Sequence, residues 1–156
     1  MATSAAESAR LLLCQVGSLV CALPLEHVAE TMRALPVEPI AGLPAFVSGV
    51  SIIRGAAVPV VDLATLLGEG STKSLARLVL VRAEARLIAL AVNEVLAIRR
   101  LESDSIAALP PLLRGTSTRF LSAAGALDAE LLLIIEAGRI VPDSAWARLL
   151  EHRESA

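Results

Sequence analysis

Residues 49–63 form the apolar run Gly-Val-Ser-Ile-Ile-Arg-Gly-Ala-Ala-Val-Pro-Val-Val-Asp-Leu, which constrains the fold more than any other part of the chain. The run is rich in β-branched residues and is interrupted by a single charged residue, Arg54, with Gly55 directly after it. This pattern predicts two buried strands joined by a tight turn, with a permanent cation at the turn. Because arginine keeps its charge in a protein, the guanidinium must be solvated, paired within the chain or offered to a partner.

Strand signals continue through most of the chain. Segments 11–16 and 19–23 flank Gly17-Ser18, which suits a two-residue hairpin turn. Residues 25–33 suggest a short helical turn that leads into a strand. Loops are expected at 35–45 and 103–118, and a turn around Glu84-Ala85. Further strands are expected at 46–53, 56–61, 76–81, 87–92, 95–99, 120–124 and 130–136. Many short strands separated by turn signals predict an all-β architecture of two small barrels.

The first hairpin has a predicted register. With Gly17-Ser18 as its turn, Cys14 lies directly opposite Cys21 on one face. No histidine stands near these cysteines at ligand spacing, so zinc binding is not expected. We interpret the pair as two packed, reduced thiols.

A few residues are expected to shape the backbone. Asp62 is placed to cap a short helix at 63–67, and Gly49 and Gly55 to meet a bulge or turn requirement. Pro142-Asp143-Ser144 predicts the start of a C-terminal helix, with Trp146, Leu149 and Leu150 on one face. The polar stretch 68–74 is the best boundary between two lobes.

Composition narrows the function classes. The 156-residue chain is 55% apolar with a mean hydropathy of +0.68, which favours exposed apolar patches and hence protein binding. A net charge of −2 without a basic stripe argues against nucleic-acid binding. The apolar stretches contain charges or prolines and do not suit a membrane span, so no membrane insertion is expected. No signal-peptide pattern opens the chain, which indicates a cytoplasmic protein.

Catalytic patterns are missing from the sequence. The two histidines, His27 and His152, do not stand beside a nucleophile in any known motif, and there is no metal signature or phosphate-binding glycine loop. We therefore expect no enzymatic activity, no metal and no cofactor.

Four segments resemble the CheW-like coupling domain of bacterial chemotaxis systems. They are the hairpin 13–23, Val28-Ala29-Glu30, the segment 44–50, and Ile52-Ile53-Arg54-Gly55 with the following Val58-Pro59-Val60-Val61-Asp62-Leu63. The second half matches more loosely, through 78–81, 89–98 and 131–136. The resemblance spans residues 9–142, with a first lobe at about 9–68, a second at about 75–142, and a helix and tail at 143–156.

This resemblance implies two SH3-like five-stranded β-barrels packed together, with short helices and a C-terminal helix. Family members are non-catalytic scaffolds in signal transduction. They bind the regulatory domain of the chemotaxis histidine kinase, and a groove between the barrels receives the cytoplasmic tip of a methyl-accepting chemoreceptor. By the same resemblance, Arg54, Glu30 and Val28 lie at the receptor-facing surface.

The sequence departs from the family at several positions. Cys14 and Cys21 stand where aromatics are common, Asn93 replaces an aspartate and Ala97 replaces a glutamate. These changes are compatible with a divergent paralogue that serves a particular receptor array or a related pathway such as surface motility.

Alternatives remain open at this point. Arg54 can be an interface residue, or a turn residue paired only with Asp62 or Glu30. The whole protein can be a chemotaxis adaptor, or a divergent CheW-like regulatory or small-ligand-binding barrel without receptor coupling, which would have a closed apolar cavity.

Overall fold

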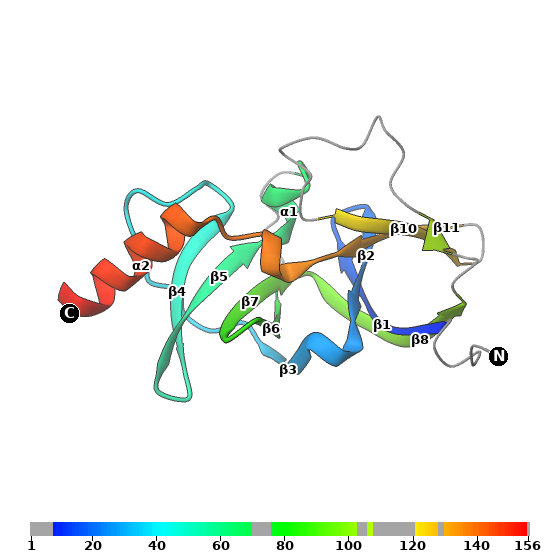
Figure 1. The fold of residues 1–156 in the computed structure, drawn as a ribbon, viewed down its shortest axis with the longest axis horizontal. Coiled ribbons are helices and arrows are strands. Elements are labelled where there is room, and N and C mark those ends of the chain that lie inside the picture. The colour runs from blue at the N-terminus through cyan, green and yellow to red at the C-terminus, as the bar shows by residue number, and fades with distance from the viewer. Residues whose placement is uncertain (1–7, 70–75, 103–105, 108–120, 128–129, 156) are drawn as a thin grey trace.

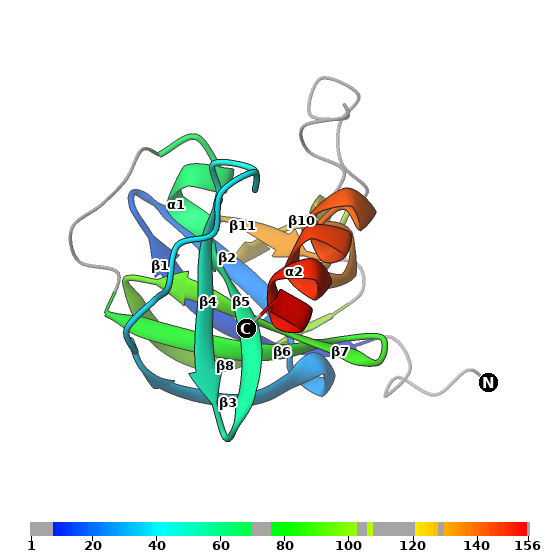
Figure 2. The same ribbon diagram turned by 90° about the vertical axis from the view of Figure 1, so that its left-hand side faces the viewer.

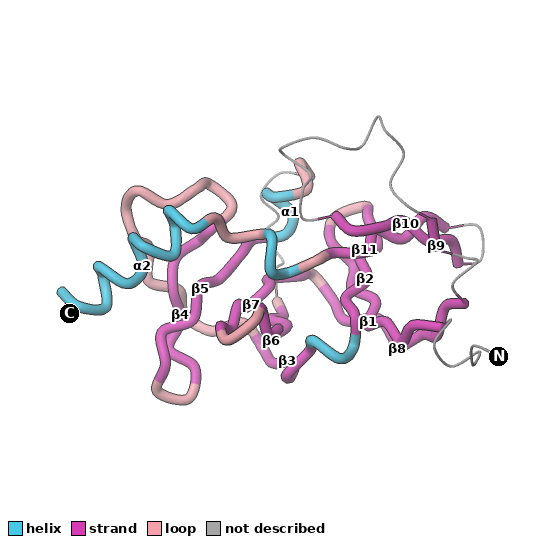
Figure 3. Tube along the Cα trace, in the orientation of Figure 1, coloured by secondary structure: helices cyan, strands magenta, loops and turns pink. Residues whose placement is uncertain are grey.

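The computed structural model describes residues 8–69, 76–102, 106–107, 121–127 and 130–155 of the chain. Strands dominate it, and they form two sheets (Figure 3). Figure 1 shows one sheet around β4 and β5 and the other around β1, β8 and β10, with β1 and α2 toward opposite ends of the long axis. The predicted all-β class is confirmed.

Sheet A has the strand order β8-β1-β2-β11-β10-β9 and sheet B the order β3-β6-β7-β5-β4. The strands of sheet A are β1 (Ser8–Val16), β2 (Leu19–Pro24), β8 (Glu94–Glu102), β9 (Ile106–Ala107), β10 (Leu121–Leu127) and β11 (Glu130–Ile135). Those of sheet B are β3 (Val28–Arg33), β4 (Val47–Ile53), β5 (Ala56–Asp62), β6 (Arg77–Ala83) and β7 (Arg86–Val92). Strand β9 lies where the sequence predicts only a loop, because residues 106–107 pair with β10.

Each sheet combines strands from both halves of the chain. The hairpin β1–β2 lies between β8 and β11, and the hairpin β6–β7 lies between β3 and β5. The two sheets also share a parallel strand pair beside the central hairpin, β2–β11 in sheet A and β5–β7 in sheet B. The expected lobes at 9–68 and 75–142 therefore do not coincide with the sheets. The 3-10 helix η2 (Leu25–His27) leads the chain from sheet A into sheet B, and Asn93 leads it back.

Both faces of the central strands are buried, which explains the long apolar runs. Alternate residues of β6 and β7 enter two different clusters: Val79, Val81, Ile88 and Leu90 join the main core shared with sheet A, whereas Leu78, Leu80, Ala89 and Ala91 join a second cluster with β4 and β5 residues. Sheet A has a third cluster of its own. Among the described residues, large exposed apolar side chains are limited to Ile52, Leu87, Leu96, Ile98 and Leu150.

The two cysteines lie as predicted. Cys14 pairs with Cys21 across β1 and β2, and both are free, fully buried thiols of the main core. Burial raises the pKa of each thiol from 9.0 to about 12. Between pH 9 and 12 the folded protein therefore holds protons that the unfolded chain releases, and stability falls as pH rises through this window.

This thiol environment makes a direct prediction. Iodoacetamide at pH 8 will leave Cys14 and Cys21 unmodified in the native protein, because only an exposed thiolate reacts at a useful rate. After unfolding in guanidinium, both will be alkylated within minutes. Mass spectrometry distinguishes the two states, and rapid alkylation of the native protein would contradict the burial described above.

The helices follow their predicted signals with one exception. The Asp62 Oδ1 atom accepts a hydrogen bond of 3.1 Å from the backbone N–H of Thr65, which caps α1 (Leu63–Leu66). In α2 (Asp143–Ser155), Trp146 packs against the main core and Leu149 is buried, but Leu150 is 51% exposed. The prediction that Leu150 shares this face is wrong, because Ala145 and Leu149, one turn apart, fill the narrow contact.

Candidate functional site

The tip of the β4–β5 hairpin carries Arg54. Arg54 and Gly55 form the two-residue turn, with φ angles of 52° and 81°. Two positive φ values are the mark of the hairpin turn whose twist fits the flanking strands. The turn carries the Arg54 side chain out of the buried run, so that it is 76% exposed.

The Arg54 side chain reaches across sheet B. Its Nη2 atom lies 2.7 Å from Glu30 Oε2 and donates a hydrogen bond of 2.9 Å to Glu30 Oε1. Glu30 belongs to β3 and Arg54 follows β4, and these two strands are the opposite edges of sheet B. The ion pair therefore connects the edges of a sheet that curves back on itself.

The segment that connects β3 to β4 also binds to the edge strand β4. Glu38 exchanges two backbone hydrogen bonds with Val50, and Ser51 Oγ donates to the Pro36 carbonyl at 2.8 Å. Gly49 sits at a bulge in β4 with a φ of 145°, where a Cβ atom would collide with the Glu38 carbonyl oxygen. The predicted backbone roles of Gly49 and Gly55 match this geometry.

A pocket of about 520 Å³ adjoins the ion pair. It lies where the start of β3, the β4–β5 hairpin and the β6–β7 hairpin converge, and we call it the hairpin pocket. Its lining residues are Ala29, Glu30, Ile53, Arg54, Ala56, Leu80, Arg82, Glu84, Ala85, Arg86 and Leu87. Figure 2 shows the two hairpins of sheet B that contribute most of them.

The structure brings together two of the three predicted receptor-facing residues. Glu30 and Arg54 share the hairpin pocket, whereas the half-buried Val28 packs against the main core. Asp62 is buried at the α1 cap and is not the partner of Arg54. Sequence reasoning missed Arg82, Glu84, Arg86 and Leu87. The predicted turn at Glu84-Ala85 was the available signal, but nothing in the sequence places that turn beside Arg54.

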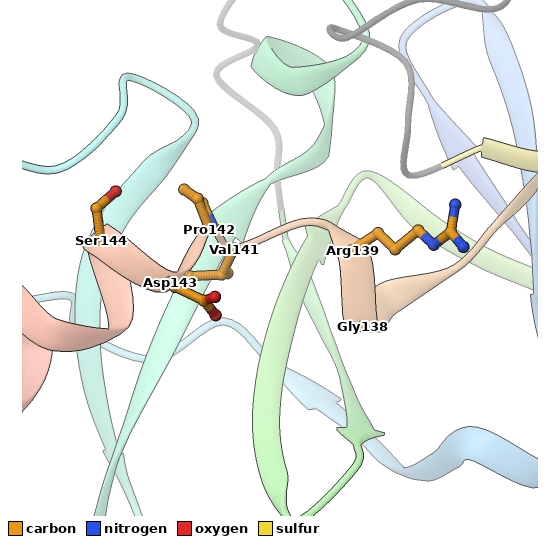
Figure 4. A pocket seen from close by; sticks show the side chains of 6 residues that line it. All are labelled: Gly138, Arg139, Val141, Pro142, Asp143 and Ser144. Carbon is orange, nitrogen blue, oxygen red and sulfur yellow. The ribbon is translucent and has the colours of Figure 1, made fainter.

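A second pocket of about 570 Å³ has a different character. The described residues that line it come from one stretch of chain, which runs from the 3-10 helix η6 (Ala137–Arg139) into the start of α2. Figure 4 shows Arg139 extending away from Asp143 and Ser144, so its polar side chains do not converge on one point. The hairpin pocket, built from three separate elements, is the better candidate for a binding site.

Asn93 has a structural role at the return into sheet A. Its Oδ1 atom accepts a 2.7 Å hydrogen bond from Gly17 N–H, and its own N–H donates to the Gln15 carbonyl. Ser18, in the same turn, donates two hydrogen bonds to Glu69 Oε1, which hold the pKa of Glu69 below its usual value. These contacts attach the β1–β2 turn to the region after α1 and to the β7–β8 junction.

Neither a metal cluster nor a membrane-spanning helix occurs among the described residues. In the part of the chain that the structure describes, no cluster of three or more His, Cys, Asp or Glu side chains could hold a metal ion. Within the same residues, no helix has the length and apolar character needed to cross a membrane.

Comparisons with known proteins agree with one another. A family model described as CheW-like domain matches residues 10–145. Chemotaxis protein CheW of Rhizobium meliloti (strain 1021) is 26% identical over 144 residues, which cover 91% of this chain and 88% of that protein. Protein FrzA of Myxococcus xanthus is 37% identical over 59 residues, which cover 38% of this chain and 37% of that protein.

A solved structure shares the fold. The crystal structure of scaffolding protein TtCheW from Thermoanaerobacter tengcongensis matches with a TM-score of 0.72 at 24% identity, covering 81% of this chain and 88% of that one. The fold is thus that of two SH3-like barrels, and the hairpin pocket is lined by exposed charged side chains. The chain belongs to the CheW-like domain family. It is accordingly a chemotaxis-type adaptor, of the class that couples chemoreceptors to a histidine kinase.

Proposed function

We propose that this adaptor is a non-catalytic, cytoplasmic scaffold that binds the cytoplasmic tip of a methyl-accepting chemoreceptor through the surface around Arg54 and Glu30. A separate surface binds the regulatory domain of the chemotaxis kinase. The protein then controls kinase activity by holding receptor and kinase in one assembly.

The Arg54–Glu30 pair at the hairpin pocket is the observation that carries this proposal. An exposed ion pair contributes only about 0–1 kcal/mol to folding, so the fold alone has little need of it. Arginine is frequent at the energetic centres of interfaces because its planar group makes several directed hydrogen bonds. Glu30, only 28% exposed, holds the Arg54 side chain in one orientation before a partner arrives.

Val28 supports this surface from below. Its register opposite Val81 and its contact with the main core fix the start of β3, two residues before Glu30. We assign Val28 the task of positioning Glu30, while Glu30 and Arg54 make the partner contacts.

The alternative of a small-ligand-binding barrel fits the geometry less well. A small apolar ligand calls for a closed cavity, whereas the hairpin pocket is rimmed by exposed charged side chains. Charged rims favour recognition of a protein surface, where they set partner choice and register.

Purification of the tagged full-length protein from its native host tests the proposal. Mass spectrometry is expected to identify a histidine kinase and a chemoreceptor in the bound fraction, and purified kinase is expected to bind the protein without receptor. Recovery of neither protein, in a host that expresses both, would contradict the scaffold role.

A further inference from the structure

The described side chains of the hairpin pocket carry more positive than negative charge. Among the described residues, three arginines and two glutamates line the pocket, a formal balance of +1. Glu30 is paired with Arg54, and among the described residues Arg82, Arg86 and Glu84 take part in no ion pair. The Arg86 guanidinium lies 4.5 Å from the ring centre of Trp146, which orients it without cancelling its charge. Arg82 is exposed on β6 without such a contact.

Apolar side chains lie directly beside these charges. The strand register places Leu87 opposite Arg82 and Leu80 opposite Glu30, so that aliphatic and charged groups alternate on one face. Leu80 and Ile53 are buried members of the second cluster, whereas Leu87 is 37% exposed. The pocket therefore offers an aliphatic surface with a positive rim.

The backbone at both hairpin tips supports a role for the side chains there. Arg54, with a φ of 52°, and Glu84, with a φ of 60°, are the two non-glycine residues with positive φ in the described part of the chain. Both line the hairpin pocket. An L-residue in this conformation costs about 1–2 kcal/mol, which glycine avoids. Because Arg54 and Glu84 both line this pocket despite that cost, we infer that their side chains contribute to binding there.

We propose that the hairpin pocket binds an acidic segment of the receptor tip, with one aliphatic side chain seated against Leu87 and a neighbouring carboxylate paired with Arg82. This inference rests on the proposed function, and it adds the chemistry of the bound segment and a second specificity-determining arginine. A carboxylate complements the free cation, and an aliphatic group removes the Leu87 surface from water.

Calorimetric titration of the full-length protein with a cytoplasmic-tip fragment of a chemoreceptor from the native host tests the charge. Arg82→Glu is expected to weaken binding about tenfold or more, because it places a carboxylate against the acidic segment. Arg77→Glu is the matched control. Arg77 is an exposed arginine at the other end of β6, outside the pocket and opposite Arg33, and its change is expected to alter affinity less than twofold.

A second pair of variants tests the aliphatic contact. Leu87→Ser is expected to weaken binding about fivefold or more, while Leu96→Ser, at an exposed leucine of β8 outside the pocket, should bind as the wild type does. Changing the carboxylates of the receptor fragment to amides should weaken binding to the wild type but strengthen binding to Arg82→Glu, because it removes the repulsion between the two carboxylates.

The outcomes separate the two proposals. If Arg82→Glu binds normally while Arg54→Glu does not, the acidic-segment inference is wrong and the receptor-facing surface stands. If the wild-type protein does not bind the fragment, the proposed function itself fails.

Discussion

Arg54→Glu is expected to abolish most receptor binding while the protein remains folded. The substitution replaces the Arg54–Glu30 attraction with two facing carboxylates at the hairpin pocket. Loss of a directed charged contact at an interface costs about 2–5 kcal/mol, which corresponds to a reduction in affinity of about 30-fold or more. Titration with the receptor-tip fragment measures this change.

The folded state should tolerate the same substitution. Arg54 is 76% exposed, and exposed ion pairs contribute about 0–1 kcal/mol to stability. Arg139→Glu is a suitable control, because Arg139 makes an exposed pair with Glu136, at 3.5 Å, outside the hairpin pocket. Arg54→Gly adds a second test, since glycine suits the positive φ and removes only the side chain. Normal receptor affinity in Arg54→Glu and Arg54→Gly would refute the assignment of this surface.

Gly49→Ala is expected to lower the free energy of unfolding more than a glycine-to-alanine change at any other described glycine. A methyl group at Gly49 would collide with the Glu38 carbonyl oxygen and lie 2.9 Å from Pro39 Cα, at a φ of 145° that alanine rarely adopts. Relief of this collision requires the backbone bridge between Glu38 and Val50 to open. Strain and overpacking of this kind cost about 3 kcal/mol or more in total.

Thermal unfolding followed by circular dichroism measures that loss. For a chain of this size, about 3 kcal/mol lowers the melting temperature by roughly 6–12 °C. Gly138→Ala is the control, because no atom lies within 4 Å of a Cβ built at Gly138. It should change the melting temperature by no more than about 2 °C. An equal effect of both substitutions would show that the close approach at Gly49 does not matter.

Local structure was largely predictable from the sequence. The hairpin turns at Gly17-Ser18 and Arg54-Gly55, the Cys14–Cys21 register and the Asp62 cap all depend on neighbours within a few residues. Turn chemistry and strand alternation act at that range, so a single sequence carries the information. The resemblance to the CheW-like family supplied the barrel type, which periodicity alone does not specify.

The exchange of β3 and β8 between the sheets was not predictable in the same way. Each strand follows a hairpin through a short connection, and a local pattern does not reveal whether the next strand continues that sheet or enters the other. Composition favoured exposed apolar patches, and among the described residues the large exposed apolar side chains are Ile52, Leu87, Leu96, Ile98 and Leu150. One apolar cluster lies between the two sheets, and each sheet has a further cluster of its own. The fold therefore buries more aliphatic surface than a single core would.

The candidate site was predicted in part. Arg54 stood out because a charge interrupted an apolar run, and Glu30 was named through the family resemblance. Arg82, Glu84 and Leu87 were missed because they come from a second hairpin, which sheet B brings beside Arg54 only after β5 and β7 have paired.

The interlocked order of the strands has a consequence for biosynthesis. Sheet B is made from one continuous stretch, β3 to β7, and can be completed while the rest of the chain is still being translated. The hairpin β1–β2 is synthesised before the other described strands, yet its flanking strands β8 and β11 are synthesised only after sheet B. The nascent β1–β2 hairpin therefore exposes apolar side chains until these two strands arrive, which makes it a segment that benefits from chaperone protection.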